Sequence, residues 1–98
     1  MNRLVLTAQL LERSALRYTP AGLPALDLSL KHESQVSQDG LARQVWFEIR
    51  ARAIGEITQR VGDLELGSMH GFAGFLGSAR NGRGVVFHVT ELDVAETP

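Results

Sequence analysis

The single tryptophan of this chain, Trp46, is the side chain best suited to bind another molecule by stacking. Apolar residues alternate with Trp46, Glu48 and Arg50 in the run 45–50. Successive side chains of a β-strand point to opposite faces, so burial of the apolar set sends these three residues outward together. An exposed aromatic ring beside a cation can stack an unpaired nucleic-acid base, although a second sheet or a partner subunit could equally cover the ring.

Arginine supplies nine of the ten basic residues, and Lys31 is the only lysine. The planar guanidinium binds phosphate through two hydrogen bonds and stacks on rings, although a GC-rich genome would produce the same bias. Arg80 and Arg83 flank Asn81-Gly82, a dipeptide typical of a hairpin turn, so we expect both on an exposed loop, where they are either solvated or in contact with phosphate. Arg50 has Glu48 as an alternative partner on the same face. Further basic residues could extend this strip: Arg13, Arg17, Lys31, Arg43, Arg50 and Arg52.

Phe75 is a second aromatic candidate, and its position depends on the register of its strand. If Phe72 and Leu76 face inward, Phe75 projects outward near the basic loop; in the opposite register it belongs to the core. Phe47 and Phe87 alternate in phase with aliphatic residues and are expected in the core. We therefore group Phe75 with Trp46 and the basic residues as candidate contacts to an unpaired nucleic-acid strand.

The chain has no pattern of residues that indicates catalysis. His32, His70 and His88 fall on three different expected elements, and no two histidines have the spacing of a metal site. Gly82-Arg83-Gly84 is a turn rather than a phosphate-binding loop, because no Gly-Lys-Ser/Thr ending and no helix follow it. Cysteine is absent, which removes disulfides and thiolate chemistry. We predict no catalytic residues, no metal and no cofactor.

Composition places the chain among ordinary folded domains. Its 98 residues fit one domain over positions 1–98, with a frayed tail at 95–98, and 44% of them are hydrophobic. The formal net charge of −1 argues against a polycationic DNA coat, because such binding depends on many Lys and Arg residues. No apolar run approaches a membrane span and the start lacks signal-peptide features, so we expect a cytoplasmic protein.

Apolar and polar residues alternate along most of the chain, and this period of two indicates that β-strands carry the candidate side chains. Strands are expected at 4–10, 26–31, 42–51, 69–77 and 85–94, the last with a bulge near Thr90. A turn is expected at 20–24, a polar loop at 33–40 and a short helix at 53–61. Three strands, a helix and two more strands form the order of the five-stranded Greek-key barrel called the OB-fold. The predicted fold class is therefore all-β with one short helix.

Several segments carry a resemblance to a known family. The stretch Asn2 to Leu6, followed by Leu16-Arg17-Tyr18-Thr19-Pro20-Ala21-Gly22, is similar to the amino-terminal third of bacterial single-stranded-DNA-binding proteins. The tetrad Arg43-Gln44-Val45-Trp46 and the segment around His32 narrow this resemblance to the family of primosomal replication protein N, PriB, across nearly the whole chain.

The resemblance implies a non-catalytic homodimer of OB-folds that binds single-stranded DNA and helps the primosome reload the replicative helicase at stalled forks. It implies a restart helicase and a helicase-loading protein as partners, and a DNA-facing Trp46. Two departures remove positive charge from the expected face: the loop holding Arg80 and Arg83 is short, and Glu33 follows His32 where relatives carry a basic residue. The alternative is a protein-interaction hub of the primosome with weak or no DNA binding.

Overall fold

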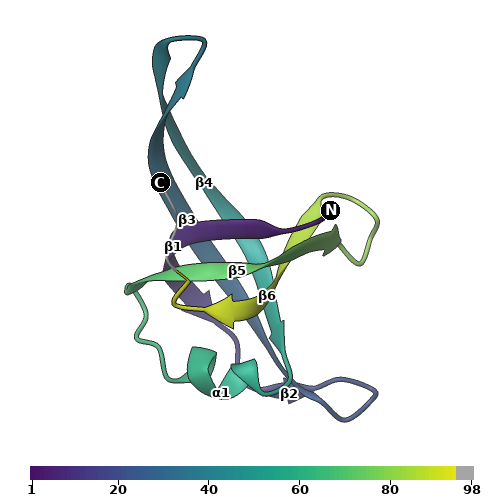
Figure 1. Ribbon diagram of the computed structural model, residues 1–98. Coiled ribbons are helices and arrows are strands. Elements are labelled where there is room, and N and C mark those ends of the chain that lie inside the picture. The colour runs from purple at the N-terminus through teal and green to yellow at the C-terminus, as the bar shows by residue number, and fades with distance from the viewer. Residues whose placement is uncertain (95–98) are drawn as a thin grey trace.

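The computed structural model describes residues 1–94 of the chain. In chain order its elements are β1 (Leu4–Arg13), β2 (Arg17–Tyr18), β3 (Pro24–Gln38), β4 (Leu41–Ile54), α1 (Ile57–Gly62), β5 (Met69–Ser78) and β6 (Val85–Leu92). Within the described range, the five long strands and the single helix follow the predicted order (Figure 1). The short β2 only pairs with the start of β3, across the turn predicted at 20–24.

The five long strands close into a barrel. They lie in the order β1-β5-β6-β4-β3, and β1 also pairs with β3 to complete the circle. The pairings are antiparallel except for β4 with β6, which run parallel with Arg52 opposite His88. This arrangement is an OB-fold and confirms the predicted fold class.

Alternating apolar residues of the five strands fill the barrel, and α1 adds Val61 to the same core. This is the arrangement that a period of two predicts when one face of each strand is buried. Phe87 is fully buried and Phe47 packs against the core, as expected from their phase. The largest fully buried side chains are Phe72, Phe87, Leu10, Leu30 and Val61.

The prediction of a loop at 33–40 is wrong, because β3 and β4 continue through these residues as a long hairpin. β3 extends to Gln38, β4 begins at Leu41, and only Asp39 and Gly40 form the turn, both with positive φ (51° and 77°). The hairpin projects from the barrel at the top of Figure 1. Residues 35–44 are exposed on both faces, so no alternating hydrophobic pattern marks them as strand. The Asp-Gly pair was the available signal, since it is typical of two-residue hairpin turns.

The predicted boundaries of the helix and of the strand before it also need correction. Ala51 and Ala53 continue the inward alternation of β4 and are buried, so this strand runs to Ile54. Gly55 then turns the chain with a φ of +91°, and α1 begins only at Ile57. The helix expected at 53–61 is therefore shorter and starts later.

The bulge predicted near Thr90 is confirmed. Gly74 pairs with Val89 and Ala73 pairs with Glu91, which leaves Thr90 as the extra residue on β6. The strand ends at Leu92 rather than at position 94. The tail predicted at 95–98 lies outside the described residues. Among the described helical residues there is no span that is long and apolar enough to cross a membrane.

Candidate nucleic-acid interface

The outer face of β3 and β4 presents two columns of mostly polar side chains. Successive cross-strand pairs on this face are Asp27 with Arg52, Ser29 with Arg50, Lys31 with Glu48, Glu33 with Trp46, and Gln35 with Gln44. The first four pairs hold three cations and three carboxylates. The formal charge of this part of the face is therefore zero, and any attraction for phosphate depends on which cations lack a partner.

Trp46 points outward, as its strand register predicts. Its exposed fraction is 63%, whereas its neighbour Phe47 is half-buried and packs against the core. No second layer formed by residues 1–94 covers the ring. Glu33 lies directly across the ladder from Trp46 and forms an ion pair with Lys31 at 3.3 Å. Lys31, a predicted DNA contact, therefore has an acidic partner.

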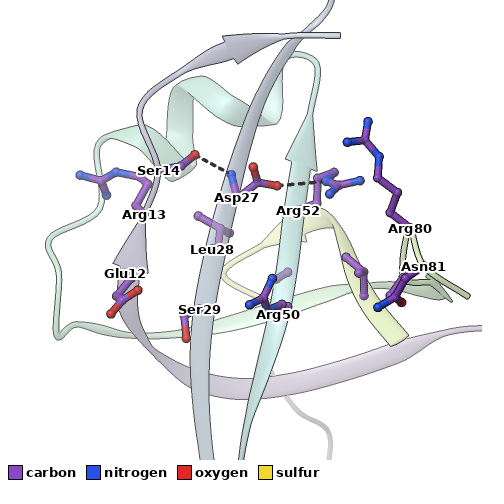
Figure 2. A pocket seen from close by; sticks show the side chains of 13 residues that line it. Glu12, Arg13, Ser14, Asp27, Leu28, Ser29, Arg50, Arg52, Arg80 and Asn81 are labelled. Atoms are coloured by element: carbon purple, nitrogen blue, oxygen red, sulfur yellow. Dashed lines mark hydrogen bonds and ion pairs between the residues drawn. The ribbon is translucent and has the colours of Figure 1, made fainter. Parts of the chain in front are cut away.

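A groove of about 760 Å³ lies next to these columns, over the ends of β1, β3 and β4 and under the loop between β5 and β6. Figure 2 shows Glu12 and Arg13 on one side, Arg80 and Asn81 on the other, and Arg50 between them. The loop that carries Arg80 is the predicted hairpin loop, closed by a hydrogen bond that the backbone amide of Ala79 donates to the carbonyl oxygen of Gly84 at 3.2 Å. The OB-fold therefore brings Arg50 and Arg80, thirty positions apart in sequence, to one groove.

Asp27 neutralises two of the arginines beside this groove. Its carboxylate accepts hydrogen bonds from Arg17 at 2.9 and 3.1 Å and from Arg52 Nε at 3.1 Å. The hydrogen bond from Arg17 is the main reason that the pKa of Asp27 lies below its ordinary value, with Arg52 adding to the effect. Arg17 and Arg52 are thus already paired, which the sequence pattern did not reveal because Asp27 lies on a different strand from each.

Four of the ten basic residues have neither an acidic partner nor a side-chain hydrogen bond within residues 1–94: Arg43, Arg50, Arg80 and Arg83. The predicted alternative pairing of Arg50 with Glu48 does not form there. Arg13, another predicted contact, donates to the carbonyl oxygens of Val61 at 3.3 Å and Leu64 at 2.6 Å, so it holds the end of α1. The unpaired arginines are the cations best able to contact phosphate.

Arg43 is unpaired, but it does not lie beside Trp46. Three positions separate the two residues on β4, so their side chains leave opposite faces of the hairpin. Arg43 instead lies across the ladder from Val36. Arg43 therefore does not belong to a basic strip on the face of Trp46, whereas Arg50 does share that outer face.

Phe75 takes the outward register of the two that the sequence allowed. Phe72 is fully buried and Phe75 has an exposed fraction of 42%. Its ring stacks on His88 with centroids 4.7 Å apart and planes at 6°. Phe75 lies on β5, separated from Arg52 on β4 by the strand that carries His88, so it is not part of the immediate surroundings of Trp46.

One cluster missed by the sequence pattern resembles a catalytic triad. Ser68 Oγ lies 2.8 Å from His70 Nε2, and His70 Nδ1 lies 3.2 Å from Asp93, which also pairs with Arg60. However, the Ser68 hydroxyl donates to the carbonyl oxygen of Glu65 at 2.6 Å. The hydroxyl proton that a triad serine gives to histidine is therefore already engaged by Glu65, and this cluster fastens the start of β5 to the end of β6. No group of three side chains suited to a metal gathers in the described part of the chain.

Comparison with known proteins assigns the chain to a family. A sequence model described as "another single-strand binding protein family" matches residues 2–91, and the chain therefore belongs to the single-strand binding protein family. A relative from Bordetella pertussis named replication restart protein PriB is 48% identical over 80 residues, covering 82% of this chain and 75% of the relative. Within the single-strand binding proteins, this chain is thus a member of the PriB family.

Solved structures agree with this assignment. The PriB protein of Ralstonia solanacearum superposes with a TM-score of 0.85 at 38% identity, covering 94% of this chain and 95% of that one. The single-stranded DNA binding protein of Thermus aquaticus gives a TM-score of 0.73 at 30% identity over 98% of this chain and 50% of that chain.

Proposed function

We propose that this protein binds single-stranded DNA without sequence specificity and acts, without catalysis, as an accessory protein of replication restart in the cytoplasm. In that role it assists helicase reloading at stalled forks, together with a restart helicase and a helicase-loading partner. The observation that carries the proposal is the shared outer face of an exposed Trp46 and an unpaired Arg50, which leads directly into the groove closed by Arg80. The names of the relatives support the same role.

Base stacking and phosphate contacts contribute separately to binding. Trp46 stacks a base, which contributes about 1–3 kcal/mol and works for every base because each has a π-face. Arg50 and Arg80 hold phosphates in the groove, and Arg83 extends this path along the loop. Trp46 and Arg50 are four residues apart on β4, or about 13 Å, so the stacked base and the held phosphates belong to different nucleotides.

A salt titration tests the proposal. Quenching of the sole tryptophan by oligo(dT) is expected, with an affinity that falls on a log-log salt plot by about 0.7 for each phosphate contacted. Two or three arginine contacts predict a slope of about −1.4 to −2.1. The Arg50→Gln variant should reduce the steepness by about 0.7, whereas Arg60→Gln, which removes an arginine on α1 outside the groove, should leave it unchanged.

The second candidate function is a protein-interaction hub with little DNA binding. Glu33 and Glu48 favour it, because these carboxylates lie across from Trp46 and two residues from it on the face that DNA would approach. Absence of detectable oligo(dT) binding at low salt would select the hub and reject the DNA-binding proposal.

We further propose that the protein is a homodimer joined through the first half of β1. β1 pairs with β5 from Leu4 to Gln9, but its pairing with β3 begins only at Gln9. Within the described chain, the segment Leu4–Leu6 therefore has a strand neighbour on one side only, and its side chains are apolar on both faces of the strand. Such an edge is a template for pairing with another chain. Sedimentation equilibrium should give about twice the chain mass of 10.7 kDa; the mass of a single chain at micromolar concentration would contradict the dimer.

A further inference from the structure

Phe75 and His88 form a pair of stacked rings on the outer surface of the barrel, at the border of the groove. The rings lie 4.7 Å apart and nearly parallel, at 6°. They are cross-strand partners on β5 and β6, so the ladder sets their separation. Parallel offset rings at this distance attract each other, and the stack can continue onto a third ring.

The surrounding backbone is shaped to hold the His88 ring. A Cβ atom at Gly77 would lie 2.9 Å from His88 Nε2 and 3.1 Å from its Cδ2, so the imidazole lies directly over this glycine. Gly77 keeps the ordinary negative φ of a strand, so the glycine is explained by the room that the ring needs rather than by backbone conformation. The absence of a side chain at position 77 thus leaves room for the ring in the orientation that stacks on Phe75.

The stacked rings continue the face that carries the arginines. Arg52, a groove-lining residue, is the cross-strand partner of His88, and Val86, two residues before His88 on β6, also lines the groove. Burial, and secondarily the nearby Arg52, lower the pKa of His88 below its ordinary value. The imidazole is therefore neutral at neutral pH and offers an aromatic surface rather than another positive charge.

We propose that Phe75 and His88 are a second base-stacking platform, at the end of the arginine groove away from Trp46. A bound strand then runs from Trp46 along β4, passes Arg50 with its phosphates in the groove, and places a later base on Phe75. The two platforms are separated by six residues along β4 and two strand spacings, or about 20 Å and 10 Å. This inference rests on the proposed DNA binding and specifies that the ligand is a single strand long enough to reach both platforms.

Strand length distinguishes two platforms from one. Site sizes in OB-folds range from about 4 to about 16 nucleotides. We expect Phe75→Ala to weaken binding of an end-labelled oligo(dT) of about 16 nucleotides by about 5- to 100-fold, measured by fluorescence anisotropy. The same variant should have little effect on an oligonucleotide of about 4 nucleotides, because this can still bind at Trp46.

Three further variants sharpen the test. Phe75→Tyr keeps the ring and should bind the long strand as the unmodified protein does. His88→Gln removes the supporting ring and should weaken long-strand binding. Met69→Ala removes an exposed side chain from the same face of β5, six residues from Phe75, and should change nothing.

The possible outcomes separate this inference from the proposal on which it rests. If the unmodified protein binds no oligonucleotide, both fail. If it binds, and Trp46→Ala weakens binding of the long strand while Phe75→Ala and His88→Gln do not, the second platform alone is rejected. The second platform would be established if Phe75→Ala and His88→Gln lose affinity for the long strand but not for the short one, while Phe75→Tyr keeps its affinity for both.

Discussion

The Trp46→Ala variant is expected to bind oligo(dT) about 10- to 100-fold more weakly than the unmodified protein, because it loses the stacking energy of one base. The fold should be unaffected. The side chain has an exposed fraction of 63%, and substitutions at such surface positions usually change the free energy of unfolding by less than about 0.5 kcal/mol. Anisotropy of a labelled oligonucleotide measures the affinity without depending on the tryptophan that has been removed.

Leu41 offers a matched control on the same hairpin. It is a large hydrophobic residue with an exposed fraction of 68%, and it lies on the face of β4 opposite Trp46. Leu41→Ala should leave the affinity unchanged. Equal losses of affinity in Trp46→Ala and Leu41→Ala would mean that DNA contacts both faces of the hairpin. An unchanged affinity in Trp46→Ala would remove the base-stacking role.

Replacing Gly74 by alanine is expected to destabilise the protein by at least about 3 kcal/mol, a large part of the roughly 5–15 kcal/mol by which a typical domain is stable. A Cβ atom at this position would occupy the space of the His88 carbonyl oxygen and also crowd the backbone nitrogen of Thr90. Both are backbone atoms of the paired strand at the bulge, so relief requires β5 and β6 to separate. Urea unfolding followed by circular dichroism gives the change in free energy.

Gly62→Ala serves as the comparison for this prediction. A Cβ atom there meets only Leu26 Cδ1, at an ordinary 3.9 Å, and the residue lies in α1. Alanine should therefore be neutral or stabilise the protein by up to about 1 kcal/mol, since it restricts the unfolded chain and favours the helix. Unfolding of Gly74→Ala at the same urea concentration as the unmodified protein would show that the bulge is less closely packed than the structure indicates.

The sequence predicts those parts of the fold in which one face is buried. Trp46 could be placed on an outer face because Phe47 and its apolar neighbours alternate with it, and the bulge at Thr90 appeared as a change of phase. The same reasoning failed at residues 33–40, where neither face of the hairpin packs on anything, so the hydrophobic pattern carried no information. There only turn chemistry, in Asp39-Gly40, could have shown the strands.

The interface was harder to predict than the fold, because charge pairing depends on contacts between strands. Arg50 and Arg52 look alike in sequence, two positions apart on one strand. The structure pairs Arg52 with Asp27, twenty-five positions away, and leaves Arg50 without an acidic partner among the described residues. The stack of Phe75 on His88 depends in the same way on the register of β5 against β6. Such contacts follow from the barrel and cannot be read from local spacing.

The projecting hairpin of β3 and β4 has a consequence for how this protein can change through evolution. The last inward-facing pair that reaches the core is His32 with Phe47, and Trp46 lies at the boundary, with the free part of the hairpin beyond it. Substitutions in residues 35–44 therefore leave the packing of the barrel unaltered and should alter its folding free energy little. Selection can therefore modify the charge of residues 35–44, and with it the proposed preference for nucleic-acid or protein partners, without changing the barrel that supports Trp46.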